Sequence, residues 1–339
     1  MILNLYTILM IFIAAVAIGL GLFLGVYAFM LYKRSRAQIS SDAQSLFEAR
    51  TYLVLLMAVV LLVVRLLSWP LFYATLLSFV PDIEGAMCIY GVTQVLPQLS
   101  TFLQMVKPIV FFLIGAWLLL HGLDRKTKTY ALMSRKFLFL LVVTLFILAD
   151  SLGDLVYMFK MNPTTTVYCC TTVFDIGSRP SSLISQSLLG QAYRTFMIPL
   201  YYVSNLVLMG SVGLVLSRGG LKNPARRRRF TLIALVALAL LNVAAVALAL
   251  IEDLGPILMN LPYHHDPYDL VQKVPDSPIF VALFILGTFA IGWALVVDVI
   301  GTKEETREII PKYLRNLLKF SLLCLLLSLV MVSLHLLLG

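Results

Sequence analysis

Residues Leu5 to Tyr32 read LYTILMIFIAAVAIGLGLFLGVYAFMLY, an apolar stretch without a single charged residue. A helix needs about 20 apolar residues to cross roughly 30 Å of hydrocarbon, so this stretch is long enough to span a membrane. Ala17, Gly21 and Gly25 recur in it at intervals of four residues, which puts three small residues on one face of a helix. We expect that face to pack closely against another membrane-spanning helix.

The composition extends this prediction to the whole chain. Of its 339 residues, 60% are hydrophobic and only 13% are charged, whereas soluble domains carry about 25% charged residues. Seven further stretches are long and apolar enough to cross a membrane, and no linker separates them. The predicted fold is therefore an all-α integral membrane protein with eight transmembrane helices in a single polytopic domain, residues 1–339. The expected spans are about 5–32, 52–80, 101–123, 137–159, 183–216, 230–251, 279–300 and 317–338.

The basic residues predict how the chain is oriented. A net charge of +9 is compatible with nucleic-acid binding, but Lys and Arg fall in short clusters between the apolar stretches. Twenty of the 26 lie in the loops that follow the first, third, fifth and seventh spans. Because cytoplasmic loops are enriched in Lys and Arg, we expect these loops to be cytoplasmic and both termini to lie on the outer, extracytoplasmic side. The expected location is the cell (inner) membrane, with the lipid bilayer as partner and no nucleic acid.

Four charged residues lie inside the predicted spans at similar depth. Arg65 in the second span and Asp150 in the fourth lie roughly 20 Å from the inner surface at 1.5 Å per residue. Asp154 is one turn further along, and Lys107 in the third span reaches a similar level. Charges in hydrocarbon are costly, so we expect the four to pair in the bundle interior, where Gly153 allows a neighbouring helix to come close. They form either a path that binds an ion, a proton or a substrate, or a structural network that fixes helix register.

Cysteines and histidines gather in the loops of the predicted outer side. Three of the four cysteines and two of the four histidines lie there, in loops that we expect to converge. Thiols on the oxidising side of a membrane tend to form disulfides. Cys88 with Cys169 or Cys170 can form a structural bridge, or the third thiol can attack that bridge in a catalytic redox exchange. The loops are Asp82–Gly91, Tyr168–Asp175 and Tyr263–Asp269.

The same loops offer ligands for a metal. His264 and His265 combined with the thiolates would supply nitrogen and sulfur donors, which suit copper or zinc. Asp266-Pro267 follows the two histidines and favours a rigid turn that would hold them in place. The sequence has no CxxC, CxxCH or HExxH motif, so no established redox, haem or metalloprotease signature supports the assignment.

These observations predict a membrane protein with an outward-facing Cys/His site used in thiol redox or in transition-metal and electron-transfer handling. Such a protein could be a subunit of a larger assembly with other membrane or periplasmic redox subunits. The first alternative is a permease whose path runs through the buried charges, and the second is a non-catalytic membrane anchor. A permease needs the buried charges for activity, whereas a redox or metal protein needs the cysteines and histidines.

Overall fold

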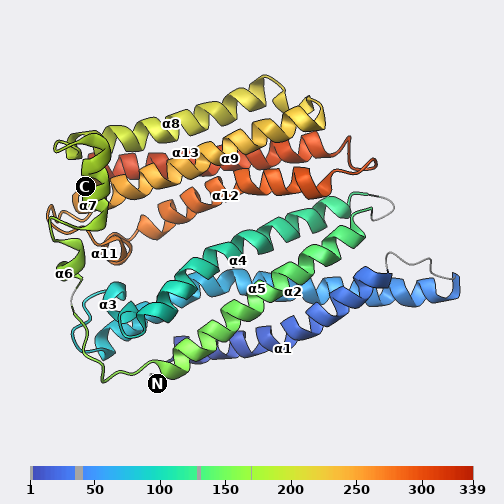
Figure 1. The fold of residues 1–339 in the computed structure, drawn as a ribbon, viewed down its shortest axis with the longest axis horizontal. Helices are drawn as coiled ribbons and strands as arrows, with labels where there is room; N and C mark the ends of the chain where they lie inside the picture. Colours follow the sequence, from blue (N-terminus) through green and yellow to red (C-terminus); the bar gives the residue numbers. More distant parts are fainter. Residues whose placement is uncertain (1–2, 35–40, 128–130, 169, 339) are drawn as a thin grey trace. The chain divides into compact units, whose positions relative to one another are not determined.

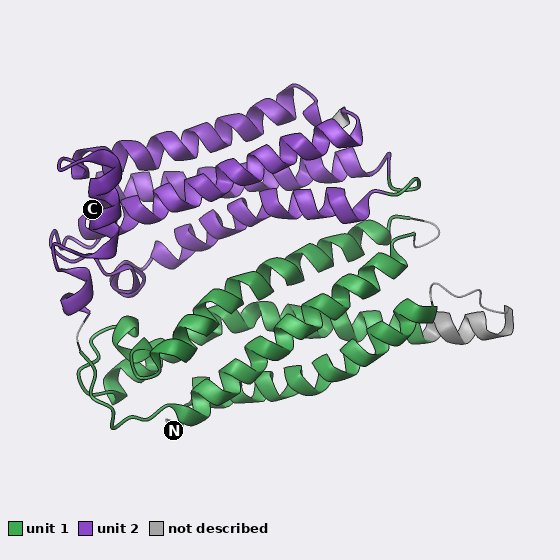
Figure 2. Ribbon diagram, viewed as in Figure 1, with its two compact units in different colours: residues 1–168, 303–306 green, residues 169–302, 307–339 purple. Residues whose placement is uncertain are grey.

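The computed structural model of this chain describes residues 3–34, 41–127, 131–168 and 170–338, and every regular element in them is a helix (Figure 1). Eight of the described helices are long and apolar enough to cross a membrane, as predicted from the sequence. The chain is thus an all-helical, multi-pass membrane protein in contact with lipid. Its helices form two compact units, residues 1–168 with 303–306 and residues 169–302 with 307–339 (Figure 2). We call them unit 1 and unit 2.

Unit 1 contains the first four long helices. A short 3-10 helix and the short α3 connect α2 to α4, and α5 packs along both α1 and α4. The elements are α1 (Leu5–Arg34), α2 (Ser41–Phe79), η1 (Val80–Asp82), α3 (Ile89–Thr93), α4 (Pro97–Asp124) and α5 (Met133–Lys160).

The small-residue face of α1 packs against α5, as the sequence predicts. Ala17 is buried, and a Cβ atom on Gly21 would lie 3.2 Å from the Leu148 side chain of α5. One turn on, a Cβ on Gly25 would lie 3.5 Å from Oγ1 of Thr144. Larger side chains at these positions would push the two helices apart, because helices approach closely only where side chains are small.

A tight contact joins the first predicted outer loop to the segment after α5. The backbone N–H of Val167 donates to the carbonyl oxygen of Glu84 at 3.0 Å. Gly85 adopts a φ of +84°, and a Cβ there would lie 2.2 Å from the Val167 carbonyl oxygen. Only glycine fits this position, because it combines a left-handed backbone with a close approach to another chain segment. The loop that carries Cys88 is therefore fixed to the segment that follows α5, within unit 1.

Unit 2 contains the other four long helices, and short helices cap one end of them. The elements are α6 (Thr171–Phe174), α7 (Pro180–Leu189), α8 (Arg194–Ser217), η2 (Gly220–Lys222), α9 (Ala225–Ala249), η3 (Leu250–Leu254), α10 (Gly255–Leu258), α11 (Pro267–Lys273), α12 (Ser277–Gly301) and α13 (Ile310–Leu338). Among these, η3 is a π-helix that continues α9.

Helices α12 and α13 form the tightest pair in unit 2. A Cβ on Gly287 would lie 2.8 Å from the Leu325 side chain. Two serines of α13 donate hydrogen bonds to backbone carbonyls of α12, Ser321 to Gly287 at 2.6 Å and Ser328 to Phe280 at 2.8 Å. Hydroxyl groups inside a membrane bundle commonly satisfy themselves in this way, and here they join two helices.

The structure divides the stretch 183–216, which the sequence predicts as one span, into two helices. Helix α7 ends at Leu189 because Gly190 adopts a φ of +78°, which no α-helix accommodates. The membrane-spanning helix, α8, begins only at Arg194. The part of the predicted span before Gly190 belongs to a separate ten-residue helix, α7, whose buried side chains are Ser182 and Ser185.

Candidate functional site

Unit 1 holds a buried group of four charges, which we call the charge quartet: Arg65, Lys107, Asp150 and Asp154. Arg65 comes from α2, Lys107 from α4 and the two acids from successive turns of α5. Nη2 of Arg65 donates to Asp150 and, at 2.7 Å, to Asp154. Nζ of Lys107 donates to Asp150 at 3.1 Å and to Asp154 at 2.7 Å. The pairing predicted from depth along the helices is confirmed.

The quartet is electrically neutral and has almost no solvent-exposed surface. Each acid contacts both cations, and the side chains are at most 1% exposed. A Cβ on Gly153, between the two acids, would lie 2.8 Å from the Leu103 side chain, so α4 approaches α5 closely here, as predicted. Lys107 also lies 4.6 Å from the centre of the Phe72 ring. Two cations matched with two anions satisfy the requirement for pairing inside a bilayer.

Arg65 nevertheless retains donors that the quartet does not use. Its Nε and Nη1 atoms are buried and have no hydrogen-bond partner. Ser151, next to Asp150 on α5, likewise has a buried hydroxyl oxygen without a partner. A buried donor without an acceptor costs about 1 to 3 kcal/mol, so these groups can hold water or a polar ligand.

A second group of chemically active side chains lies in unit 2, around the turn that precedes α11. Asp266 caps α11, because its side chain accepts the backbone N–H of Tyr268 at 2.9 Å and Pro267 occupies the first helical position. Asp269 lies in the first turn of the same helix. The backbone N–H of His264 donates to the Leu261 carbonyl at 3.0 Å, which closes the turn before the cap. The rigid turn predicted from Asp266-Pro267 therefore holds His264 near two acids.

His264 binds a carboxylate with each ring nitrogen. Its Nδ1 lies 2.9 Å from Asp175, which ends α6, and its Nε2 lies 2.8 Å from Asp269. Ligand atoms of His264, Asp266 and Asp269 all lie within 4.8 Å of one another. We call these three residues, with Asp175 behind them, the His264 site.

The acids around His264 favour its protonated form. Burial by itself lowers the pKa of His264, but hydrogen bonds to Asp175 and Asp269 and the charges of both raise it above the ordinary value. Both nitrogens can donate only when the ring carries two protons. Lys273 adds a second cation, 2.7 Å from Asp269. With the His264 ring protonated, the three carboxylates of Asp175, Asp266 and Asp269 lie near two positive charges.

His265 points to different partners. Its backbone N–H donates to Asp175 at 3.1 Å, and its Nδ1 donates to the Tyr263 carbonyl at 3.1 Å. Burial and the charge of Arg179 lower the pKa of His265, which favours the neutral ring. Its Nε2 is buried without a partner. His265 is not one of the three residues whose ligand atoms converge, so the two neighbouring histidines have different surroundings.

The cysteines of the predicted thiol site belong to different units. Cys88 is buried just before α3 in unit 1, and Cys170 is buried just before α6 in unit 2. Cys169 lies outside the described residues. A bridge or an exchange among these thiols stays a prediction. Cys324 is buried in α13, where the sequence predicts an ordinary core residue.

The sequence analysis missed the acids of the His264 site and several buried ion pairs. Asp175, Asp266 and Asp269 stand in the very loops that carry the histidines, and this proximity was the available signal. The buried pairs have distances of 2.5 to 2.6 Å. Lys136 pairs with Asp124 across the short connection between α4 and α5, whereas Arg179 with Glu252 and Arg228 with Asp298 join residues that are 73 and 70 positions apart. Glu252 also accepts a hydrogen bond from Tyr193 at 2.8 Å.

The helices and these two groups define a multi-pass membrane protein with a neutral charge cluster in one unit and an acidic histidine site in the other. No family model matches the chain, and no curated protein or solved structure is significantly similar to it.

Proposed function

We propose that this protein binds a divalent transition-metal ion at the membrane surface through His264, Asp266 and Asp269. The observation that carries the proposal is the convergence of one imidazole nitrogen and two carboxylates within 4.8 Å. One nitrogen and two oxygen donors with an open fourth position suit Zn²⁺. Copper(I) prefers thiolate and thioether ligands, so this donor set favours zinc over copper.

Asp175 supports the proposal because it is the hydrogen-bond partner of the metal-binding histidine, His264. A metal-binding histidine usually donates its second ring N–H to a carboxylate, which fixes the ring orientation and makes the other nitrogen more basic. Asp175 accepts from Nδ1 of His264 at 2.9 Å and so leaves Nε2 for the ion. It also accepts the backbone N–H of His265, so both residues of the turn are tied to one carboxylate. The ion would replace the proton that Nε2 shares with Asp269.

The charge pattern of the loops supports placing this site outside the cell. We propose that the His264 site and both termini lie on the extracytoplasmic side of the inner membrane, and that the whole chain acts as one membrane domain. In that position the site would receive or hand on a metal ion outside the cytoplasm, with other membrane or periplasmic subunits as partners. The thiols of the other two loops on the same side of the membrane would then be a second, softer ligand set or a disulfide.

Zinc titration of the full-length protein, purified in detergent and stripped of metal, tests the proposal. We expect isothermal calorimetry to give one zinc per wild-type chain and no such binding for His264→Asn. His335→Asn is the matched control, because His335 also lies in unit 2 and also pairs with an acid, Asp276, at 3.3 Å. Wild-type protein that binds no zinc, or His264→Asn that binds it unchanged, would overturn the proposal.

A permease is the second candidate, and the unused donors of Arg65 favour it. A solute path through unit 1 requires water to reach the charge quartet, and the partnerless Ser151 is a suitable reporter because its hydroxyl bonds nothing. In a permease, Ser151→Cys reacts with a small hydrophilic thiol reagent, whereas Ile147→Cys, one turn away in the apolar core, does not. If the reagent labels neither introduced cysteine, the quartet is a structural network and not a solute path.

A further inference from the structure

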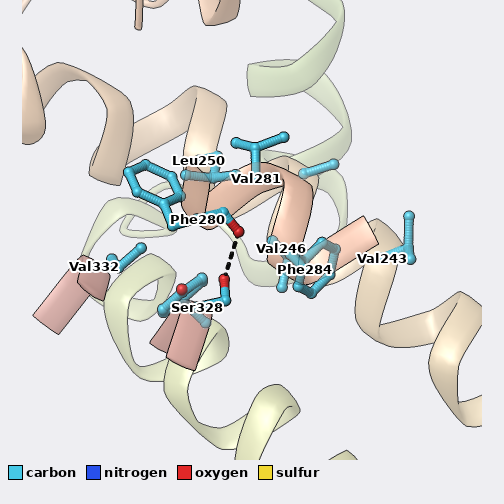
Figure 3. A pocket seen from close by; sticks show the side chains of 10 residues that line it. Val243, Val246, Leu250, Phe280, Val281, Phe284, Ser328 and Val332 are labelled. Carbon is cyan, nitrogen blue, oxygen red and sulfur yellow. Dashed lines mark hydrogen bonds between the residues drawn. The ribbon is translucent and has the colours of Figure 1, made fainter. Parts of the chain in front are cut away.

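Unit 2 contains an apolar pocket of about 120 Å³ among α8, α9, α12 and α13 (Figure 3). Each helix contributes lining residues, among them Tyr201, Val246, Phe280 and Val332, and Leu250, the first residue of the π-helix η3, also lines the pocket. Ser328 also lines the pocket, but its hydroxyl is already used in the hydrogen bond to the Phe280 carbonyl drawn in Figure 3. The pocket therefore offers contact surface for hydrocarbon.

The pocket lies close to one end of the four helices. Tyr201 is two turns from the beginning of α8, and Phe280 is one turn from the beginning of α12. Val332 is less than two turns from the end of α13. At 1.5 Å per residue, these positions are roughly 5 to 10 Å from the helix ends, whereas the hydrocarbon layer is about 30 Å thick. The pocket thus lies within the depth of a single leaflet.

The pocket opens onto the surface of unit 2. Val243, one of its lining residues, is 37% exposed, and Val281 and Phe284 are partly exposed. The phase that meets a spanning helix at this depth is lipid hydrocarbon. A cavity of about 150 Å³ accepts a benzene molecule, so this pocket has room for a short segment of an acyl chain.

Two opposite charges stand where the headgroup of such a lipid would lie. Arg194, an exposed residue, begins α8 seven residues before Tyr201 and therefore lies on the same helix face, about 10 Å further out. Asp253 lies on η3, three residues beyond Leu250, and η3 packs against α8. Each charge is thus the outward neighbour of a pocket residue on its own helix. One cation beside one anion matches a headgroup that carries a phosphate and an ammonium group.

We propose that unit 2 holds one zwitterionic glycerophospholipid, with an acyl chain in the pocket, its phosphate at Arg194 and its ammonium at Asp253. The π-helix contributes to this site, because one extra residue in a turn changes the direction of the side chains that follow. Leu250, the first residue of η3, lines the pocket, and Asp253 stands three residues further along the same π-helix. This lipid site involves none of the residues of the His264 site.

Native mass spectrometry of the full chain in mild detergent tests the lipid site. We expect the wild-type chain to retain one phosphatidylethanolamine in preference to phosphatidylglycerol. Arg194→Gln should weaken retention roughly fivefold, the effect of one basic residue near a lipid surface. Arg218→Gln is the matched control, because Arg218 is also exposed and follows the other end of α8, and it should change nothing.

Two further variants test binding of the acyl chain and recognition of the headgroup separately. Val243→Phe narrows the opening at a partly exposed position and should abolish retention, while Asp253→Asn should remove the preference for the zwitterionic lipid without abolishing binding. The proposal is overturned if wild type retains no lipid, if it retains phosphatidylglycerol equally well, or if Arg194→Gln and Arg218→Gln behave alike. If Val243→Phe lowers the folded yield, the comparison of lipid retention between Arg194→Gln and Arg218→Gln still decides whether the proposal holds.

Discussion

The charge quartet of unit 1 and the His264 site of unit 2 are both built from acids held near cations, yet their charges balance differently. In the quartet, two carboxylates meet two permanent cations, and every side chain is essentially inaccessible. In the His264 site, three carboxylates meet Lys273 and a histidine that can lose its proton, and the His264 side chain is 13% exposed. A neutral, closed group has no electrostatic reason to take up a metal ion. The acidic group, whose His264 and Asp175 side chains are partly exposed, does.

The largest effect should come from breaking the quartet. Arg65→Met leaves two carboxylates against one lysine inside the bundle, and removal of one partner of a buried pair costs about 3 to 5 kcal/mol. Thermal unfolding in detergent and folded yield measure the loss. The double variant Arg65→Met/Asp150→Asn restores neutrality and should recover much of it. A single variant as stable as wild type would show that the quartet is not a closed structural unit.

Weakening the hydrogen bond between Asp175 and the metal-binding His264 should have the next largest effect. Asp175→Asn keeps the shape of the side chain but weakens the hydrogen bond from Nδ1 of His264, and changes of this kind typically reduce metal affinity about 10- to 100-fold. Zinc titration measures the change. Asp276→Asn, which alters the partner of the control histidine His335, should leave zinc binding as it is. Equal affinity in both variants would remove Asp175 from the site.

Stability without metal and affinity for zinc should depend on pH in opposite directions, because the first needs protonated His264 and the second needs it deprotonated. Its pKa is raised in the folded protein, so in the absence of metal the stabilisation it provides is complete below the unfolded value, about 6.5, and is lost as pH rises through the folded value. Zinc competes with the proton for Nε2, so its affinity should increase over the same range. Unfolding temperatures of wild type and His264→Asn, each with and without zinc, isolate the contribution of His264. A wild-type minus variant difference that is independent of pH would contradict the assignment of its protonation.

The smallest effect should come from Lys273. Its side chain is 47% exposed, and its pair with Asp269 is a solvent-screened contact between residues four apart on a helix. Such pairs contribute about 0.3 to 0.5 kcal/mol. Lys273→Gln should therefore hardly change stability but should raise zinc affinity slightly, because a cation that competes for Asp269 is gone. Weaker zinc binding in this variant would mean that Lys273 helps to build the site rather than limiting it.

The membrane-spanning helices and the quartet could be predicted because both depend on simple periodic geometry. A charge stands out in an apolar stretch, and counting 1.5 Å per residue puts Arg65 and Asp150 at equal depth without any knowledge of the packing. The beginning of the fifth span could not be found in this way. Helix α7 is apolar enough to extend the span by composition, but residues 190–193, which start with the positive φ of Gly190, form a turn that separates the two helices.

The His264 site could be predicted only in part, for a physical reason. The turn at Asp266-Pro267 depends only on residues that are close in sequence, so it can be predicted. It places Asp266 and Asp269 beside His264. Asp175 is 89 residues away in another loop, and no periodicity fixes how two loops meet. Acids in loops are usually solvated, so their burial here depends on tertiary contacts that the sequence does not display.

X-ray absorption at the zinc edge of the wild-type protein, loaded with one equivalent of zinc, tests the account most directly. The His264 site predicts a first shell of nitrogen and oxygen atoms alone, at about 2.0 to 2.2 Å, which is lost in His264→Asn and kept in His335→Asn. A sulfur shell at about 2.3 Å would contradict the account, because it would assign the ion to the cysteines instead.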